Sequence, residues 1–122
     1  MTFSKQTTGQ KGEAAAIDYL KKRRYQILEQ NFRCQFGEID IITQKAGVLC
    51  FVEVKTRHDA SHGSPAEAVT RYKQHKIIQT ALYYLQQQDP GHNEMRFDVV
   101  TVDYDSHGKM MIDLIENAFE TP

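Results

Sequence analysis

The sequence predicts a single α/β domain in which helices flank a mixed central β-sheet. Three observations lead to this prediction. With 122 residues, 40% of them hydrophobic, the chain is long enough for one core and short for two. Two segments carry apolar residues at helical spacing, and five others alternate like strands. The segments follow one another in the order α-β-β-β-α-β-β, and no repeat, low-complexity segment or linker divides them.

The first element is a helix from about Gly9 to Arg24. Small and apolar residues recur along it at helical spacing: Gly12, Ala16, Tyr19 and Leu20. Its basic last turn, KKRR, suits the negative end of a helix dipole. Residues 1–8 lack periodicity and are expected to form a flexible leader, so the domain spans residues 9–122.

Three strand-like runs follow: YQILEQNFR, GEIDIITQ and VLCFVEVKTR. The second and third are separated by Lys45-Ala46-Gly47, which predicts a hairpin. The polar stretch 58–65 then reads as a flexible loop.

A longer helix is expected from Pro65 or Ala66 to Gln88. One face of it is apolar: Ile77, Ile78, Ala81, Leu82 and Leu85. MRFDVVTVDY is a strand, DSHG a turn, and KMMIDLIENAF a last strand with a short helical turn at its end.

The predicted hairpin brings two acids into conflict. If it closes symmetrically about Ala46-Gly47, paired residue numbers add up to 93, which sets Asp40 opposite Glu53 and Glu38 opposite Lys55. Directly opposed like charges are destabilising, and a bound cation removes the conflict. Two carboxylates suit a hard cation such as Mg²⁺ or Mn²⁺.

The apolar residues between these acids are expected to share the opposite, core-facing side of the hairpin: Ile39, Ile41, Val52 and Val54. Because the side-chain period is two, a slip of one residue would put the two acids on opposite faces.

Lys55 shares the face of Glu53 by strand alternation. An ammonium beside a metal-bound water can orient that water or neutralise charge on a phosphate, so the three residues make a hydrolytic site for a phosphodiester. Taken alone, a Glu-x-Lys pair is also ordinary on a solvated strand.

Four more residues are candidates for the same site. Glu13 begins an apolar stripe with Ile17 and Leu20, and could be a rim residue or a third carboxylate. Lys73 and Gln74 lie one turn before the buried face of the long helix and could meet a phosphate or the attacking water. Arg57, on the face of Lys55, could add a contact to nucleic acid.

Bulk charge is less informative than its distribution. A formal net charge of −1 gives no general reason to expect nucleic acid. Residues 1–76, however, have a balance of +5 and residues 77–122 a balance of −6, so a basic face is expected on the first part. No apolar run is long enough for a signal peptide or a membrane span, and the expected location is the cytoplasm.

Four blocks together resemble a known family: GEIDIIT, FVEVKTR, AVTRYKQHKIIQTALYYL and MRFDVV. Asp40 and, after twelve intervening residues, Glu53-Val54-Lys55 resemble the motif of the PD-(D/E)xK nuclease superfamily. More closely, the blocks are similar to the bacterial YraN family, which is predicted to be related to Holliday junction resolvases. The similarity runs from about Gly9 to Phe119.

The resemblance implies a restriction endonuclease-like core, Mg²⁺ or Mn²⁺ as cofactor and a nucleic-acid substrate, with DNA, branched or damaged, as the expected form. Asp40 and Glu53 match the metal ligands, Lys55 the catalytic lysine and Glu13 the helix acid of many members. Ile39 replaces the proline of the motif, which removes no ligand. Resolvase relatives act as dimers, so a homodimer is among the expected assemblies.

Two functions stay open at this point. A metal-dependent endonuclease is favoured by the intact Asp, Glu and Lys set. A non-catalytic nucleic-acid-binding module or adaptor that keeps the nuclease fold is favoured by the nearly neutral net charge. Asp98, in the block MRFDVV, is a structural or a functional acid.

Overall fold

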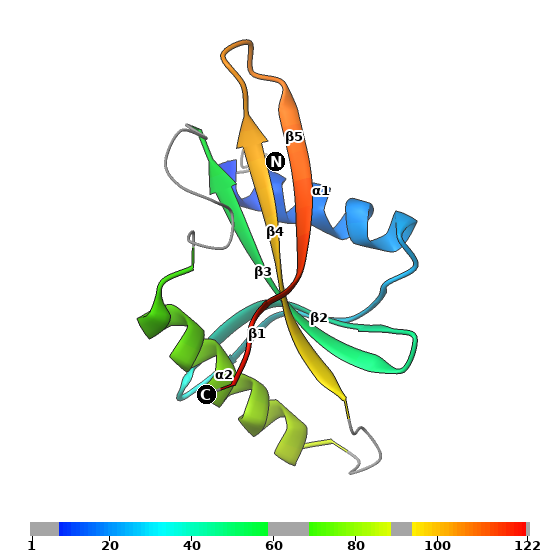
Figure 1. Cartoon of the computed structure of the whole chain (residues 1–122), viewed down its shortest axis with the longest axis vertical. Coiled ribbons are helices and arrows are strands. Elements are labelled where there is room, and N and C mark those ends of the chain that lie inside the picture. Colours follow the sequence, from blue (N-terminus) through cyan, green and yellow to red (C-terminus); the bar gives the residue numbers. More distant parts are fainter. Residues whose placement is uncertain (1–7, 59–68, 89–93, 122) are drawn as a thin grey trace, which may run out of the picture.

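The computed structural model describes residues 8–58, 69–88 and 94–121, which form a five-stranded sheet with a helix on each face (Figure 1). The order α-β-β-β-α-β-β and the mixed sheet confirm the predicted fold class. The elements are α1 (Thr8–Lys22), β1 (Gln26–Cys34), β2 (Gly37–Lys45), β3 (Val48–Arg57), α2 (Arg71–Gln86), β4 (Met95–Tyr104) and β5 (Met110–Phe119).

The strands lie in the order β1-β2-β3-β4-β5. Only β3 and β4 are parallel, and the other neighbouring pairs are antiparallel. Parallel neighbours need a long crossover connection, and α2 is the helix of that crossover. Among the described residues, neither helix has the length and apolar character that crossing a membrane requires.

Two apolar cores lie on opposite faces of the sheet. On one face, α2 packs its buried residues against Phe51 and Phe97. On the other, α1 packs against Val52 and Val100. Successive residues of β3 alternate between the two cores, as a pleated strand requires.

The expectation that Ile39, Ile41, Val52 and Val54 share one face is wrong for Ile39. Ile41 and Val52 pack on the α1 side, whereas Ile39 belongs to the core under α2. The face changes at Asp40, where β2 leaves β3. Beside this point, on β1, Asn31 has a left-handed φ of 54° that interrupts the regular pleat.

Two predicted boundaries also change. The second helix begins at Arg71, since Val69 and Thr70 are not helical. Of the predicted loop 58–65, residues 59–65 lie outside the described residues. Thr70 is the N-cap, and its side chain accepts a hydrogen bond from the backbone N–H of Lys73 at 3.2 Å, which fixes the start of the helix.

At the C-terminal end, β5 continues as a strand to Phe119 without the predicted helical turn. The register against β4 shifts between Phe97 and Val99, and Asn117 takes a left-handed φ of 52° there, so the irregularity is a bulge. At the N-terminal end, α1 begins at Thr8, and the rest of the predicted leader, residues 1–7, lies outside the described residues.

Candidate active site

The candidate site lies where β2 and β3 separate. The two strands pair from Lys45 and Val48 to Ile41 and Val52, in the register in which residue numbers add up to 93, as predicted. At the next position the carboxylate of Asp40 takes over: its Oδ2 accepts the backbone N–H of Val54 at 2.8 Å. A side chain thus ends the β2–β3 ladder, and the strands diverge on the left of Figure 1.

Because the ladder ends at Asp40, Glu38 does not lie opposite Lys55, and that part of the predicted register is wrong. Glu38 pairs with β1 instead, where it faces Arg33 and forms an ion pair with its guanidinium at 3.3 Å. Past Val54, β3 continues alongside β4 as far as Arg57.

Asp40 and Glu53 meet at this fork. The side chain of Glu53 is only 5% exposed. Burial, together with the close approach and the charge of the Asp40 carboxylate, raises the pKa of Glu53 to about 9, although the nearby ammonium of Lys73 opposes the shift. The two acids are therefore neighbours, and only one of them is readily ionised at neutral pH without another cation.

The Glu53 carboxylate is only half satisfied. Its Oε1 lies 3.4 Å from Nζ of Lys73, whereas its Oε2 is buried without a hydrogen-bond partner in the part of the chain that the structure describes. An unpaired buried carboxylate oxygen next to a second carboxylate fits the ligand chemistry of a hard divalent cation.

Within residues 8–58, 69–88 and 94–121, no three His, Cys, Asp or Glu side chains converge to hold a metal ion. Glu13 is therefore not grouped with Asp40 and Glu53 as a third ligand. A pair of acids still suits Mg²⁺, which usually keeps several waters and binds one or two carboxylates together with substrate phosphates. Asp40 and Glu53 are the residues that would hold it.

A hollow of about 230 Å³ opens over the fork. Four elements contribute to it: α1, the diverging strands β2 and β3, and the first turn of α2. Its described lining residues are Gly9, Glu13, Asp40, Val54, Lys55, Thr56 and Lys73. The structure thus brings four predicted site residues into one hollow: Glu13, Asp40, Lys55 and Lys73. Glu53 forms an ion pair with one of them, Lys73.

Glu13 reaches the hollow because α1 packs closely on β3. A Cβ atom at Gly12 would collide with Oγ1 of Thr56, so glycine permits this approach. Burial, then the charges of Asp40 and Glu38, raises the pKa of Glu13. The helix acid therefore lies within the electrostatic field of the fork.

Asn31 is a site residue that sequence reasoning missed. With its amide nitrogen turned toward the acids, it donates to Oε1 of Glu13 at 3.0 Å and to Oε1 of Glu38 at 3.2 Å. It thereby ties α1 to β1 and β2 beside Asp40. One signal was available, since asparagine is disfavoured inside strands and tolerates the left-handed backbone.

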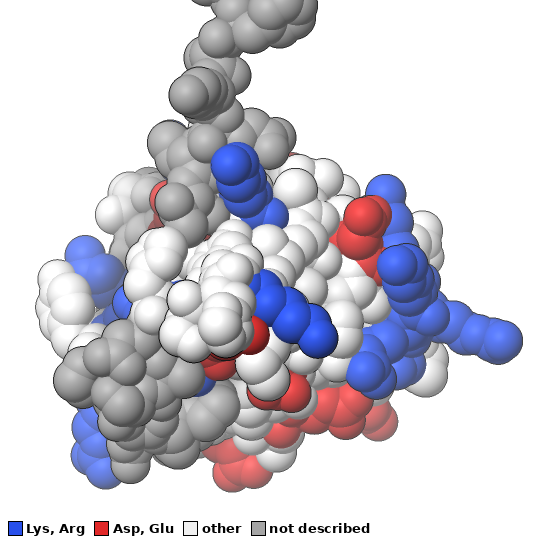
Figure 2. All heavy atoms as spheres, turned by 90° about the horizontal axis from the view of Figure 1, so that it is seen from above, with Lys and Arg blue, Asp and Glu red and all other residues white. Residues whose placement is uncertain are grey.

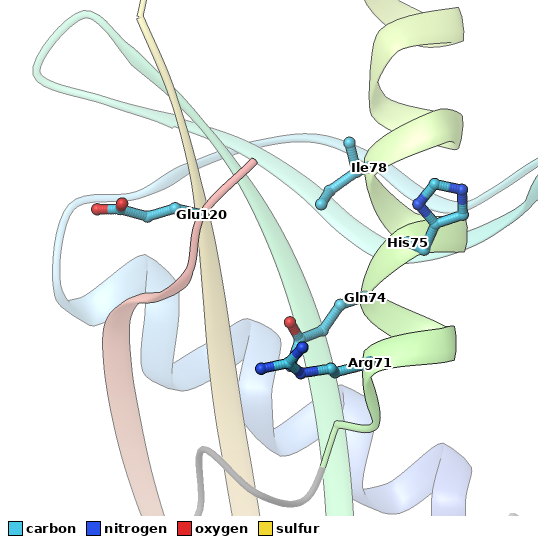
Figure 3. Close-up of a pocket in the computed structure, with 5 residues that line it drawn as sticks. All are labelled: Arg71, Gln74, His75, Ile78 and Glu120. Atoms are coloured by element: carbon cyan, nitrogen blue, oxygen red, sulfur yellow. The ribbon is translucent and has the colours of Figure 1, made fainter. Parts of the chain in front are cut away.

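The structure places Arg57 and Gln74 away from this hollow. Arg57 makes two hydrogen bonds to the carboxylate of Asp103, at 2.7 and 2.9 Å, and both side chains are largely buried. Gln74 donates from Nε2 to the carbonyl of Val69 at 2.9 Å. It lines a second hollow, between α2 and the segment after β5, with Arg71, His75, Ile78 and Glu120 (Figure 3).

The block MRFDVV has a structural role on the other face of the sheet. Asp98 is fully buried and accepts hydrogen bonds from the guanidinium of Arg96, the hydroxyl of Tyr25 and the backbone N–H of Asn117. This network joins the α1–β1 connection, β4 and the bulge of β5. Each oxygen of the Asp98 carboxylate already accepts two hydrogen bonds from described residues, so the carboxylate is satisfied without a ligand.

Charge is unevenly distributed over the surface. Lys and Arg gather at one side of the molecule in Figure 2. The last turn of α1 carries exposed Lys21 and Lys22, and exposed Arg23 and Arg24 follow the helix directly. The exposed acids Asp113 and Glu116 lie on β5. The predicted separation of a basic part from an acidic C-terminal part is thus visible in the fold.

Comparison with known proteins identifies the family. Residues 12–102 match the model of a family described as "Uncharacterised protein family UPF0102". A UPF0102 protein of Geobacter metallireducens is 44% identical over 121 residues, covering 98% of both chains. One of Caldicellulosiruptor saccharolyticus is 43% identical over 118 residues, covering 96% of this chain and all of the relative. The YraN-like resemblance is thereby confirmed at the level of the family, and the chain belongs to the UPF0102 family.

Proposed function

We propose that this protein is a metal-dependent endonuclease that hydrolyses phosphodiester bonds of nucleic acid, with DNA as the expected substrate, in the cytoplasm. One observation supports the proposal most: Asp40 and Lys55 line one hollow at the fork of β2 and β3, and Glu53, next to Asp40, has a buried carboxylate oxygen without a hydrogen-bond partner among the described residues. The resemblance to the PD-(D/E)xK superfamily supports the same assignment of roles.

Asp40 and Glu53 would hold Mg²⁺ or Mn²⁺, whose charge would polarise a phosphodiester oxygen and lower the pKa of a coordinated water. Asp40 is aimed at the site by the N–H of Val54, and Glu53 by the core around it. Both carboxylates are thus preorganised, which keeps the cost of ordering them low.

The two lysines have different roles. Lys55 lines the hollow, and its ammonium orients the attacking water and neutralises charge that develops on the phosphate. Without a metal ion, the ammonium of Lys73 balances the charge of Glu53. Once a metal ion takes that role, the half-exposed Lys73 side chain becomes available to a phosphate oxygen. Glu13 assists from the rim, where its raised pKa favours holding a proton.

The same ion pair favours a second candidate function, a nucleic-acid-binding module without catalysis. Lys73 already supplies a positive charge to Glu53 at 3.4 Å, so the fork has a partial substitute for a metal ion. In that case nucleic acid binds equally well with and without divalent cations.

The decisive experiment measures cleavage of plasmid, single-stranded and four-way-junction DNA with Mg²⁺, with Mn²⁺ and with EDTA. Asp40→Asn and Lys55→Ala are each expected to lower the metal-dependent rate by about 100-fold or more. Asp18→Asn, an exposed acid of α1, and Lys76→Ala, one turn beyond Lys73, are the matched controls and keep the rate. Cleavage that survives both site substitutions argues against the proposal, and metal-independent binding without cleavage supports the binding module.

A further inference from the structure

A third hollow, of about 400 Å³, lies where β3 ends beside the β4–β5 turn and the start of α1, at the upper end of the molecule in Figure 1. Its described lining residues are Lys11, His58, Tyr104, Asp105, Ser106 and Gly108. No step of the proposed hydrolysis uses any of them.

Two aromatic rings of this hollow form a stacked pair. The rings of His58 and Tyr104 are nearly parallel, with an interplanar angle of 14° and centroids 5.4 Å apart. His58 is exposed and Tyr104 is half-buried. A planar ring from a ligand can extend such a stack, and bases of any sequence bind to aromatic side chains in this way.

The turn that follows Tyr104 is held by several hydrogen bonds. Asp105 Oδ1 accepts the backbone N–H groups of His107 and Lys109, both at 2.8 Å. The backbone of Asp105 also pairs with Lys109 and Gly108 across the turn. Because the Asp105 carboxylate is held against these N–H groups, the platform is preorganised, and the exposed Lys11 supplies an ammonium among the described lining residues that can meet a phosphate.

This hollow adjoins the candidate active site. Thr56, near the end of β3, lines the active-site hollow, and His58, directly after the strand, lines this one, two residues further or at most about 6.6 Å of extended chain. On α1, Gly9 and Glu13 line the first and Lys11 the second. A separation of about 6.6 Å corresponds to about two stacked nucleotides, so a single strand can occupy both hollows.

We propose that this hollow binds an unpaired nucleotide that flanks the scissile phosphodiester, with its base stacked on the His58–Tyr104 pair and its phosphate near Lys11. The proposal rests on the proposed function for the identity of the neighbouring site. A base inside a duplex is already stacked on both sides, whereas an unpaired base has a free face. The protein is therefore selective for single strands, flaps and junction branches over continuous duplex.

The test measures binding in EDTA, so it does not depend on catalysis. Fluorescence anisotropy is recorded with a labelled oligothymidylate, the matching oligouridylate and a duplex of equal length. His58→Ala and Tyr104→Ala are each expected to weaken oligothymidylate binding about tenfold, or about 1.4 kcal/mol, and to leave duplex binding unchanged. Tyr104→Phe keeps the ring and the affinity.

His107→Ala, in the same turn, is the matched control and binds like wild type. Because His58 is exposed, His58→Ala is not expected to disturb folding, so it tests the stacking even if the Tyr104→Ala variant folds poorly. Equal oligonucleotide affinity of wild type, His58→Ala and Tyr104→Ala overturns the inference, as does a wild-type protein that binds duplex but no single strand. If the wild-type protein cleaves no substrate but binds oligothymidylate in a way that depends on the His58 and Tyr104 rings, only the proposed function is overturned. The ratio of oligothymidylate to oligouridylate affinity separates DNA from RNA as the preferred strand.

Discussion

Two buried carboxylates occupy neighbouring positions on the parallel strands β3 and β4 and differ in almost every other respect. Glu53 of β3 and Asp98 of β4 point to opposite faces of the sheet, because Glu53 pairs with Val99 in the register. Asp98 is surrounded by donors: a guanidinium, a hydroxyl and a backbone N–H. Glu53 has one lysine at 3.4 Å, a second carboxylate beside it and one oxygen that finds no hydrogen-bond partner among the described residues.

The contrast separates a structural acid from a functional one. Buried polar groups in folded proteins are nearly always satisfied, so a satisfied network such as that of Asp98 needs no ligand to explain it. A carboxylate kept next to another acid and left half paired costs stability, and such departures from local consistency are expected at functional sites. The two positions therefore predict opposite responses to substitution.

The largest effect is expected at Asp98. Asp98→Ala removes the acceptor for the Arg96 guanidinium, the Tyr25 hydroxyl and the Asn117 N–H, and it leaves Arg96 with only Glu116 and the Tyr25 hydroxyl as partners among the described residues, so the free energy of unfolding falls by about 3 kcal/mol. Urea denaturation followed by circular dichroism measures the loss. Asp113→Ala, at an exposed position of β5, is the control and stays within about 0.5 kcal/mol of wild type. A loss below about 1 kcal/mol at Asp98 would remove one side of the comparison.

The opposite sign is expected at Glu53. Its pKa is raised from 4.5 to about 9 in the folded protein, so the folded state binds this proton more tightly than the unfolded state. The stabilisation is therefore complete below pH 4.5 and is lost as the pH rises toward 9. Glu53→Gln keeps a neutral side chain at every pH and should be more stable than wild type by roughly 2 kcal/mol at pH 8 in EDTA.

Thermal unfolding from pH 5 to pH 9 measures this difference. The wild-type melting temperature should decline with pH more steeply than that of Glu53→Gln, and Glu94→Gln, an exposed acid before β4, should follow wild type. Parallel pH profiles for wild type and Glu53→Gln would mean that Glu53 is ionised without cost in the folded protein.

A bound divalent cation should restore the stability that the folded protein loses when Glu53 ionises. At ten times its dissociation constant, Mg²⁺ bound to the folded state alone adds about 1.4 kcal/mol to the free energy of unfolding. Melting curves with and without Mg²⁺ should show this gain for wild type and neither for Asp40→Asn nor for Glu53→Gln. A gain that persists in both variants places the cation elsewhere on the protein.

The sequence could predict the local part of the site but not the long-range part. The hairpin register followed from its turn and its apolar alternation, because antiparallel neighbours are close in the chain. The backbone N–H of Val54 donates to the Asp40 side chain instead of to a backbone carbonyl of β2. The alternation of apolar residues in the sequence cannot predict such a replacement. The Arg57–Asp103 pair depends on the parallel register of β3 and β4, which joins residues 46 apart in the chain. Lys73 was singled out from its position one turn before a buried helix face; it lies 3.4 Å from Glu53, and its contact with a phosphate stays a prediction.

The smallest effect is expected at the cap that positions Lys73. Thr70→Ala removes the hydroxyl that accepts the Lys73 N–H, at a cost of about 1 kcal/mol, whereas Thr70→Ser keeps the cap. Because Lys73 lowers the pKa of Glu53, fraying of this first turn should also steepen the decline of stability with pH. The pH dependence distinguishes the two roles of the cap. If Thr70→Ala lowers the free energy of unfolding equally at all pH values, Thr70 only stabilises the start of the helix. If the loss grows toward pH 9, Thr70 also holds Lys73 in place beside Glu53.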